Sequence, residues 1–122
     1  MVTTILIVDD NEVFRSSARS VVQAAGYDVI GEAGDVADAV EKVHALRPDV
    51  VLLDIQLPDG DGFTLADELA HEEGSPSVVL VSSRERADYG SRVDDARAVG
   101  FISKLDLSRA SLEALLGHDR TG

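Results

Sequence analysis

Residues 47–63 read RPDVVLLDIQLPDGDGF, and the apolar run inside this stretch decides the fold class. The segment DVVLLD, residues 49–54, holds four consecutive Val and Leu residues between two acids. Such an unbroken run is typical of a strand that is buried on both faces, as in a parallel sheet covered by helices. The acid that ends the run, Asp54, is therefore the first candidate functional residue.

Four further apolar runs flank this segment: TILIV at 4–8, DVIGEA at 28–33, SVVLVS at 77–82 and GFIS at 100–103. Helical patterns separate the runs, with Asn11 and Asp35 placed to cap the first two helices. A third helix is expected near residues 65–70, a weakly apolar fourth near 85–98 and a fifth after residue 104. This alternation predicts an α/β fold, a three-layer sandwich of a five-stranded parallel sheet and five helices.

Composition narrows the classes of function. A chain of 122 residues has the length of one domain, and the absence of cysteine excludes disulfides, thiolate metal sites and cysteine nucleophiles. The formal net charge of −12 disfavours direct binding to nucleic acid or to anionic lipid. No apolar stretch approaches the ~20 residues that span a bilayer, and the N-terminus has no basic leader. We therefore expect no membrane segment, no signal peptide and a cytoplasmic location.

Polar residues lie where the expected strands end. Asp9 and Asp10 follow the first strand, Asp54 ends the third, Ser82 ends the fourth and Lys104 follows the fifth. The carboxyl ends of parallel strands share one edge of the sheet, so these side chains should converge. Carboxylates held together repel one another unless a cation lies among them, and an all-oxygen set favours Mg²⁺. Capping of the first helix remains a second interpretation of Asp9 and Asp10, and it is compatible with metal binding.

The segments ILIVDDN, RPDVVLLDIQLPDGDGF, VVLVSS and GFISK together resemble the receiver domains of two-component response regulators, in order and in spacing. The resemblance covers nearly the whole chain, and GEAGD and GFISKLDLS are similar to the LuxR-type branch. It implies a flavodoxin-like fold with strand order 2-1-3-4-5, a receiver domain at 1–117, and a tail or linker at 118–122.

The same resemblance implies partners and activity. The phosphodonor would be a sensor histidine kinase, Mg²⁺ the cofactor with Mn²⁺ as a substitute, and the output a C-terminal DNA-binding domain outside this chain. A dimer that forms on phosphorylation is also implied. The protein would catalyse its own phosphorylation and slow dephosphorylation, so it is not a conventional enzyme.

The resemblance also assigns roles to residues at the strand ends. Asp54 would be the phosphoacceptor, Asp10 a direct Mg²⁺ ligand and Asp9 a ligand largely through water. The backbone carbonyl of Gln56 would complete the metal ligands. Lys104 would pair with a phosphoryl oxygen.

Two residues would carry the conformational switch. The Ser82 hydroxyl would bind the phosphoryl group, and Phe101 would turn inward, although an ordinary core aromatic is the other interpretation of Phe101. Gln56 and Arg84 would flank the approach of water and set the lifetime of the acyl phosphate; for Arg84 the alternative is a solvent-facing arginine. Leu105 stands where the family often has proline after the lysine, which leaves the geometry of the Lys104–Leu105 peptide open.

Other classes fit less well. A phosphohydrolase with an aspartyl nucleophile needs a second acid two residues later, where this chain has Gln56. A calcium loop built on DGDGF would begin at Leu57, which has no ligand oxygen in its side chain. A stand-alone receiver that acts through protein–protein interaction, and a receiver-like scaffold that works without phosphorylation, remain the alternatives.

Overall fold

The computed structural model describes residues 2–117, and its centre is a five-stranded parallel sheet with the order β2-β1-β3-β6-β7. The strands are β1 (Thr4–Val8), β2 (Asp28–Ala33), β3 (Val50–Asp54), β6 (Ser77–Ser82) and β7 (Gly100–Ser103). The helices are α1 (Glu12–Ala24), α2 (Val36–Leu46), α3 (Gly62–Ala70), α4 (Ser91–Asp95) and α5 (Arg109–Leu116). Counted by chain order, the sheet has the predicted order 2-1-3-4-5, so the predicted fold class is confirmed. The tail predicted at 118–122 lies outside the described residues.

Successive residues of each apolar strand face opposite sides of the sheet, which divides the core in two. Ile5 and Ile7 of β1 pack in a cluster with Leu112 of α5. Leu6 and Val8 pack in the other cluster, with Leu65 of α3. Because both faces of β1 and β3 are buried, the continuous runs in the sequence are explained by burial on two sides.

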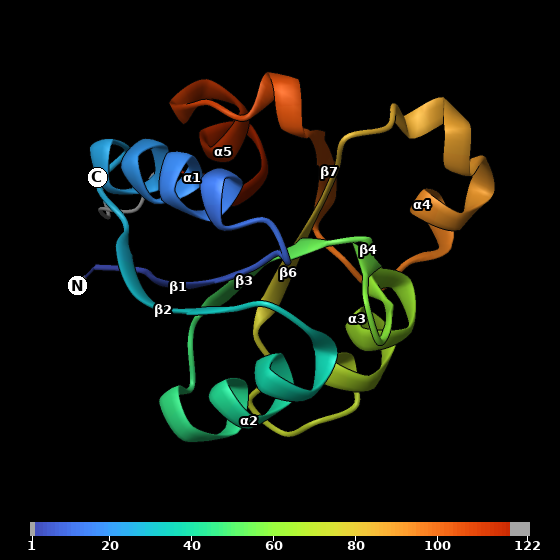
Figure 1. Cartoon of the computed structure of the whole chain (residues 1–122), viewed down its shortest axis with the longest axis horizontal. Helices are drawn as coiled ribbons and strands as arrows, with labels where there is room; N and C mark the ends of the chain where they lie inside the picture. The colour runs from blue at the N-terminus through green and yellow to red at the C-terminus, as the bar shows by residue number, and fades with distance from the viewer. Residues whose placement is uncertain (1, 118–122) are drawn as a thin grey trace.

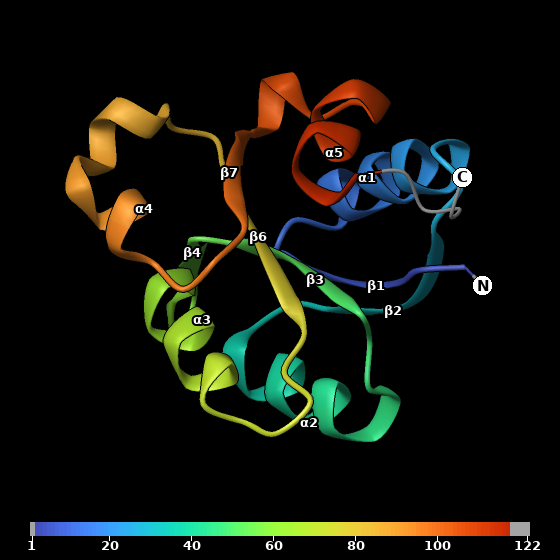
Figure 2. The same ribbon diagram turned by 180° about the vertical axis from the view of Figure 1, so that it is seen from behind.

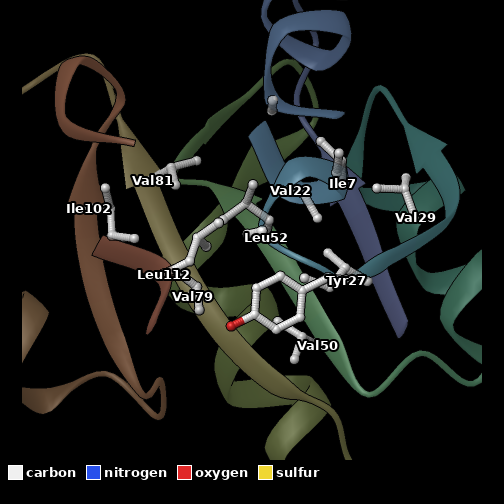
Figure 3. Packing of buried hydrophobic residues seen from close by; sticks show 13 residues of the cluster. Ile7, Val22, Tyr27, Val29, Val50, Leu52, Val79, Val81, Ile102 and Leu112 are labelled. Atoms are coloured by element: carbon white, nitrogen blue, oxygen red, sulfur yellow. The ribbon is translucent and has the colours of Figure 1, made fainter. Parts of the chain in front are cut away.

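The helices form the outer layers of the sandwich. Figure 1 shows α1 and α5 on one face of the sheet and α2 and α3 on the other, and Figure 2 shows the same arrangement from behind. In both views α4 lies at the β7 edge, away from the middle of the sheet. Figure 3 shows the first core cluster, where the Tyr27 ring lies beside Leu112 and Val50. The Tyr27 hydroxyl donates to the carbonyl of Gly117 at 3.2 Å, which ties the end of α5 to this face.

Helix caps were predicted correctly for the first two helices. The Asn11 side chain accepts from Phe14 N at 3.1 Å, and the Asp35 side chain accepts from Asp38 N at 2.8 Å. Gly26, with φ +98°, follows the end of α1 in a conformation that favours glycine.

The fourth helix differs from the prediction. In place of one helix over about 85–98, the chain forms a 3₁₀ turn, η1 (Arg86–Tyr89), and then the five-residue α4. Gly90 separates them with φ +60° and ψ −139°, outside the helical region. Of the α4 residues only Val93 is buried, so little apolar packing is available to extend this helix.

A two-stranded hairpin that was not predicted follows the central strand. It pairs β4 (Gln56–Leu57) with β5 (Gly60–Asp61), and its turn residue Asp59 accepts from the backbone N–H groups of Val36 and Ala37 at 2.7 and 3.1 Å. The Asp59 side chain therefore joins the hairpin to the N-terminus of α2. These two backbone hydrogen bonds hold the pKa of Asp59 below its usual range.

The described residues contain neither a membrane-spanning helix nor a cis peptide bond. Between residues 2 and 117 no helix is long and apolar enough to cross a membrane. The same stretch contains no cis peptide bond, so the Lys104–Leu105 peptide is trans. The lysine leads into a short 3₁₀ turn, η2 (Lys104–Asp106), before α5 begins at Arg109.

Candidate functional site

Three acids converge at the carboxyl ends of β1 and β3. Carboxylate oxygens of Asp9, Asp10 and Asp54 all lie within 4.8 Å of one another. Asp9 and Asp54 are buried, whereas Asp10 is exposed. The predicted convergence of these residues is thus present in the structure, because β1 and β3 are hydrogen-bonded neighbours at the centre of the sheet.

Asp54 lies in an environment that opposes its ionisation. Burial raises the pKa of Asp54 to about 6; the backbone N–H of Gln56 opposes this shift, and the charge of Asp9 adds to it. Gln56 N donates to Asp54 Oδ1 at 3.1 Å, and Lys104 Nζ donates to Asp54 Oδ2 at 3.4 Å. Each carboxylate oxygen therefore has one donor, and a cation in addition to Lys104 would relieve the remaining repulsion between Asp54 and Asp9.

Lys104 connects the two buried acids. Its Nζ lies 2.6 Å from Asp9 Oδ2 and 3.4 Å from Asp54 Oδ2. Burial alone would lower the pKa of Lys104, but Asp9 and Asp54 together raise it above its usual value, so the ammonium form is favoured. The ammonium also lies 4.4 Å from the centre of the Phe14 ring, which supports it as a cation–π partner.

The acidic cluster has the donors that a small, hard divalent cation requires. Among the described residues, Asp9 Oδ2 is the only buried side-chain polar atom without a well-directed hydrogen bond; its short contact with Lys104 is ionic. The Asp10 carboxylate has no protein partner among residues 2–117. An oxygen-only set with uncommitted lone pairs fits Mg²⁺ or Mn²⁺ better than zinc or copper.

Ser82 has two partners in the structure. Its Oγ lies 2.6 Å from the hydroxyl of Tyr89, and it accepts from Arg84 N at 3.0 Å. The Tyr89 ring in turn makes edge contacts with the rings of Phe63 and Phe101, with centroids 5.5 and 6.0 Å apart. The hydroxyl at the end of β6 is thus linked through Tyr89 to Phe101 on β7.

The two residues predicted to flank the approach of water are exposed. The Gln56 side chain lies in β4, and Arg84 follows the end of β6. Arg84 contacts the site through its backbone N–H, which donates to Ser82 Oγ. Its guanidinium has no ion-pair partner among the described residues, so both interpretations of Arg84 remain predictions.

Sequence reasoning missed three residues that shape the site. Gly62 lies so close to the acceptor strand that a Cβ there would be 2.7 Å from the Asp54 carbonyl oxygen. Phe14, whose ring lies against the Lys104 ammonium, and Tyr89 were not singled out from the sequence. Tyr89 could have been found as a single aromatic in the polar segment 83–92, but its contact with Ser82 depends on how that segment folds back.

Comparison with known proteins agrees with this geometry. Residues 5–116 match the family described as the response regulator receiver domain. The chain is 35% identical over 100 residues to the transcriptional regulatory protein PdtaR of Mycobacterium tuberculosis, covering 82% of this chain and 48% of that protein. It is 39% identical over 102 residues to a protein-glutamate methylesterase/protein-glutamine glutaminase of Myxococcus xanthus, covering 82% of this chain and 29% of that protein.

A solved structure gives the same result. The signal receiver domain of the putative response regulator NarL from Mycobacterium tuberculosis superposes with a TM-score of 0.81 at 30% identity, covering 95% of this chain and 98% of that one. Thus the chain spans about half the length, or less, of the curated relatives it matches, and nearly all of a solved receiver domain. The family match, the parallel sheet order and the acids at its carboxyl edge lead to one conclusion: this chain belongs to the response regulator receiver domain family.

Proposed function

We propose that this receiver accepts a phosphoryl group on Asp54, with Mg²⁺ held by Asp9, Asp10, Asp54 and the Gln56 carbonyl. The observation that carries the proposal is the convergence of three carboxylates within 4.8 Å, with Lys104 beside two of them. Bound Mg²⁺ would supply positive charge to the phosphoryl oxygens and offset the repulsion among the acids. Mn²⁺ would serve as a substitute because it takes the same oxygen ligands.

The residues of the chain would act as follows. An oxygen of the Asp54 carboxylate attacks phosphorus, and the bond from phosphorus to the donor atom breaks as the acyl phosphate forms. Lys104 stabilises the charge on the transferred group, and it already lies near both buried acids. The Gln56 backbone N–H holds Oδ1 of Asp54, which fixes the orientation of the carboxylate. Hydrolysis of the acyl phosphate would return the carboxylate, and Gln56 and Arg84 would tune that rate.

We further propose a phosphohistidine of a sensor kinase as the donor and a cytoplasmic location for the exchange. Residues 1–117 would form the receiver, and residues 118–122 would begin the connection to an output. The relatives have different outputs, since one is described as a transcriptional regulatory protein and another as a methylesterase and glutaminase. The resemblance to the LuxR-type branch favours a DNA-binding output and a dimer that forms on phosphorylation. A stand-alone receiver that binds a partner protein is the alternative.

Phosphorylation of purified protein tests the central proposal. Acetyl phosphate with Mg²⁺ should add one phosphoryl group, and Asp54→Asn or a chelator should prevent the addition. Asp59→Asn is a matched control, because Asp59 lies in the neighbouring turn outside the acidic cluster and asparagine can still cap α2. Equal labelling of the Asp54 variant, measured by intact mass, would place the acceptor at another residue, whereas wild type that takes no label would support the phosphorylation-independent scaffold.

A further inference from the structure

The side chain of Arg15 reaches from α1 to the backbone of the acidic cluster. Its Nη1 donates to the carbonyl oxygen of Asp9 at 2.6 Å, and its Nε donates to Glu32 Oε1 on β2 at 3.0 Å. The guanidinium is mostly buried, with 19% of the side chain exposed. Arg15 therefore connects β2 to the loop that carries Asp9 and Asp10.

Glu32 is itself held firmly. Its second carboxylate oxygen accepts from Arg19 Nε at 2.8 Å, and its backbone carbonyl accepts from the ammonium of Lys42. Burial opposes ionisation of this carboxyl, but Arg19 and Arg15 hold the pKa of Glu32 below its usual range. The carboxylate is thus a permanently charged anchor for Arg15 at neutral pH.

The carbonyl that Arg15 binds belongs to the Asp9–Asp10 peptide. On the other side of Asp9, the backbone N–H donates to the Ala33 carbonyl at 3.0 Å. The Asp10 side chain is exposed and has no protein partner in the described part of the chain, so backbone contacts alone fix its position. The orientation of this peptide helps to set the direction in which the Asp10 side chain leaves the backbone.

We infer that Arg15 is a positioning residue that orients the Asp10 carboxylate for the cation by holding the Asp9–Asp10 peptide through its contact with Glu32. This inference rests on the proposed function of the site. Simple charge would have the opposite effect: a cation beside an acidic cluster weakens the binding of a second cation. Removal of Arg15 should therefore tighten Mg²⁺ binding if only charge matters, and weaken it if positioning matters.

Arg19 supplies a matched control. It carries the same charge and binds the same Glu32 carboxylate, but in the described part of the chain it makes no hydrogen bond or ion pair with Asp9. Calorimetric titration of residues 1–122 with MgCl₂ would compare wild type, Arg15→Ala and Arg19→Ala. We expect the Kd for Mg²⁺ to rise about tenfold in Arg15→Ala, as for other partners that orient metal ligands, and to stay within about twofold in Arg19→Ala.

A second measurement separates positioning from general damage to the fold. Phosphorylation by acetyl phosphate should be slow in Arg15→Ala at low Mg²⁺ and should approach the wild-type rate at saturating Mg²⁺. If Arg15→Ala does not fold, Arg15→Lys keeps the charge but loses the planar fork that spans Glu32 and the Asp9 carbonyl, and its Mg²⁺ affinity should fall several-fold. Equal or tighter Mg²⁺ binding in the Arg15 variant that folds would overturn the inference and leave the proposed function intact. Failure of wild type to bind Mg²⁺ would overturn both.

Discussion

Asp54 illustrates at the scale of one residue how position determines chemistry. Its backbone belongs to the central strand, so the carboxylate is buried at the end of that strand and lies close to Asp9. Burial favours the protonated form, while Lys104 and the Gln56 N–H favour the carboxylate that a nucleophile requires. A pKa of about 6 means that the carboxylate predominates at neutral pH even without a bound cation.

This raised pKa makes stability depend on pH. Because the folded pKa exceeds the usual value of 3.8, the folded state binds more protons than the unfolded state between those values. The contribution of Asp54 to stability is fully present below about pH 4 and is lost as pH rises through about 6. Without Mg²⁺, Asp54→Asn should therefore raise the free energy of unfolding at pH 7 to 8, by on the order of 2 kcal/mol. The gain should vanish near pH 4.

Urea denaturation of both proteins across this pH range measures the difference. Asp28→Asn serves as the control, since Asp28 is an exposed acid at the amino end of β2, paired with Thr4, whereas the acidic cluster lies at the carboxyl ends of the strands. A gain in Asp54→Asn that persists unchanged at pH 4 would mean that ionisation of Asp54 is not its cause.

Gly62 provides a second prediction at this scale. A Cβ at this position would lie 2.7 Å from the Asp54 carbonyl oxygen and 2.9 Å from Ile55 Cα, and both are backbone atoms that cannot turn aside. Gly62→Ala should therefore lower the free energy of unfolding by about 1 to 3 kcal/mol and shift the signals of Asp54 in NMR spectra. Gly34→Ala is the control, because its nearest neighbour, Arg15 Nη1, would be at an ordinary 3.6 Å. Equal effects of the two changes would contradict the steric explanation.

At the scale of elements, the sequence predicts strands better than it predicts the segment after β6. Burial on both faces gives β1, β3 and β6 continuous apolar runs, and the bounds predicted at 4–8, 28–33, 77–82 and 100–103 agree with the structure. The β4–β5 hairpin and the break at Gly90 leave no such pattern, since they depend on turn geometry and on contacts with other elements. The predicted strand ends were enough to locate the acids, Ser82 and Lys104 at one edge of the sheet. The roles of Arg15 and Tyr89 could not be predicted in this way, because they depend on side-chain packing between elements.

The segment formed by η1 and α4 has little apolar anchoring, since Val93 is the one buried residue of these two elements. An open surface pocket of about 360 Å³ lies between α3 and α4, away from the acidic cluster, and is lined by Phe63, Thr64, Asp67, Arg92, Asp95, Ala96 and Arg97. Tyr89, through its hydroxyl and ring contacts, is a main link between the segment and the strands. Elements with few buried contacts open at low free-energy cost.

Removal of the Tyr89 hydroxyl should therefore ease the switch. The proposed switch draws Ser82 Oγ toward the phosphoryl group and away from Tyr89, and a hydrogen bond of this kind contributes about 1 kcal/mol, or about fivefold in an equilibrium. Tyr89→Phe should thus respond to the phosphoryl mimic beryllofluoride at about fivefold lower concentration, as followed by NMR signals from residues 82–104. Tyr27→Phe, which removes a hydroxyl on the opposite face of the sheet, should leave the response unchanged. A weaker response in Tyr89→Phe would show that the phenol promotes the switched state.

At the scale of the whole molecule, the well-packed central strands are separate from the weakly anchored segment formed by η1 and α4. The acids lie at the ends of β1 and β3, which are buried on both faces and flanked by strands on each side. Ser82 lies at the end of β6, toward the β7 edge, where its Oγ contacts Tyr89 of the weakly anchored η1. A charge change at the fixed centre can therefore alter one edge of the protein while the core remains in place, which is the arrangement that a signalling domain needs.

Because the net charge is −12, cations should affect the thermal stability of the protein in two ways. Any salt should stabilise so acidic a chain by screening self-repulsion, whereas Mg²⁺ should add a specific term by binding only the folded state. At ten times its Kd, Mg²⁺ should contribute about 1.4 kcal/mol, or roughly 5 °C in Tm, beyond NaCl of equal ionic strength. Thermal denaturation in matched salts measures this excess.

Substitution of Asp9 or Asp10 shows how much each acid contributes to the Mg²⁺-specific rise in Tm. Asp9 is already committed to Lys104 and to the Asn11 N–H, at 2.6 and 2.8 Å, whereas the Asp10 carboxylate is exposed and has no partner in residues 2–117. Asp10→Ala should therefore abolish most of the Mg²⁺-specific rise in Tm, and Asp9→Ala should retain more of it. For each variant the rise is measured from its own Tm in NaCl. The loss of stability that follows from removal of the Asp9–Lys104 ion pair is thereby subtracted. A larger loss in Asp9→Ala would assign the main ligand to the buried acid and leave Asp10 at the rim of the site.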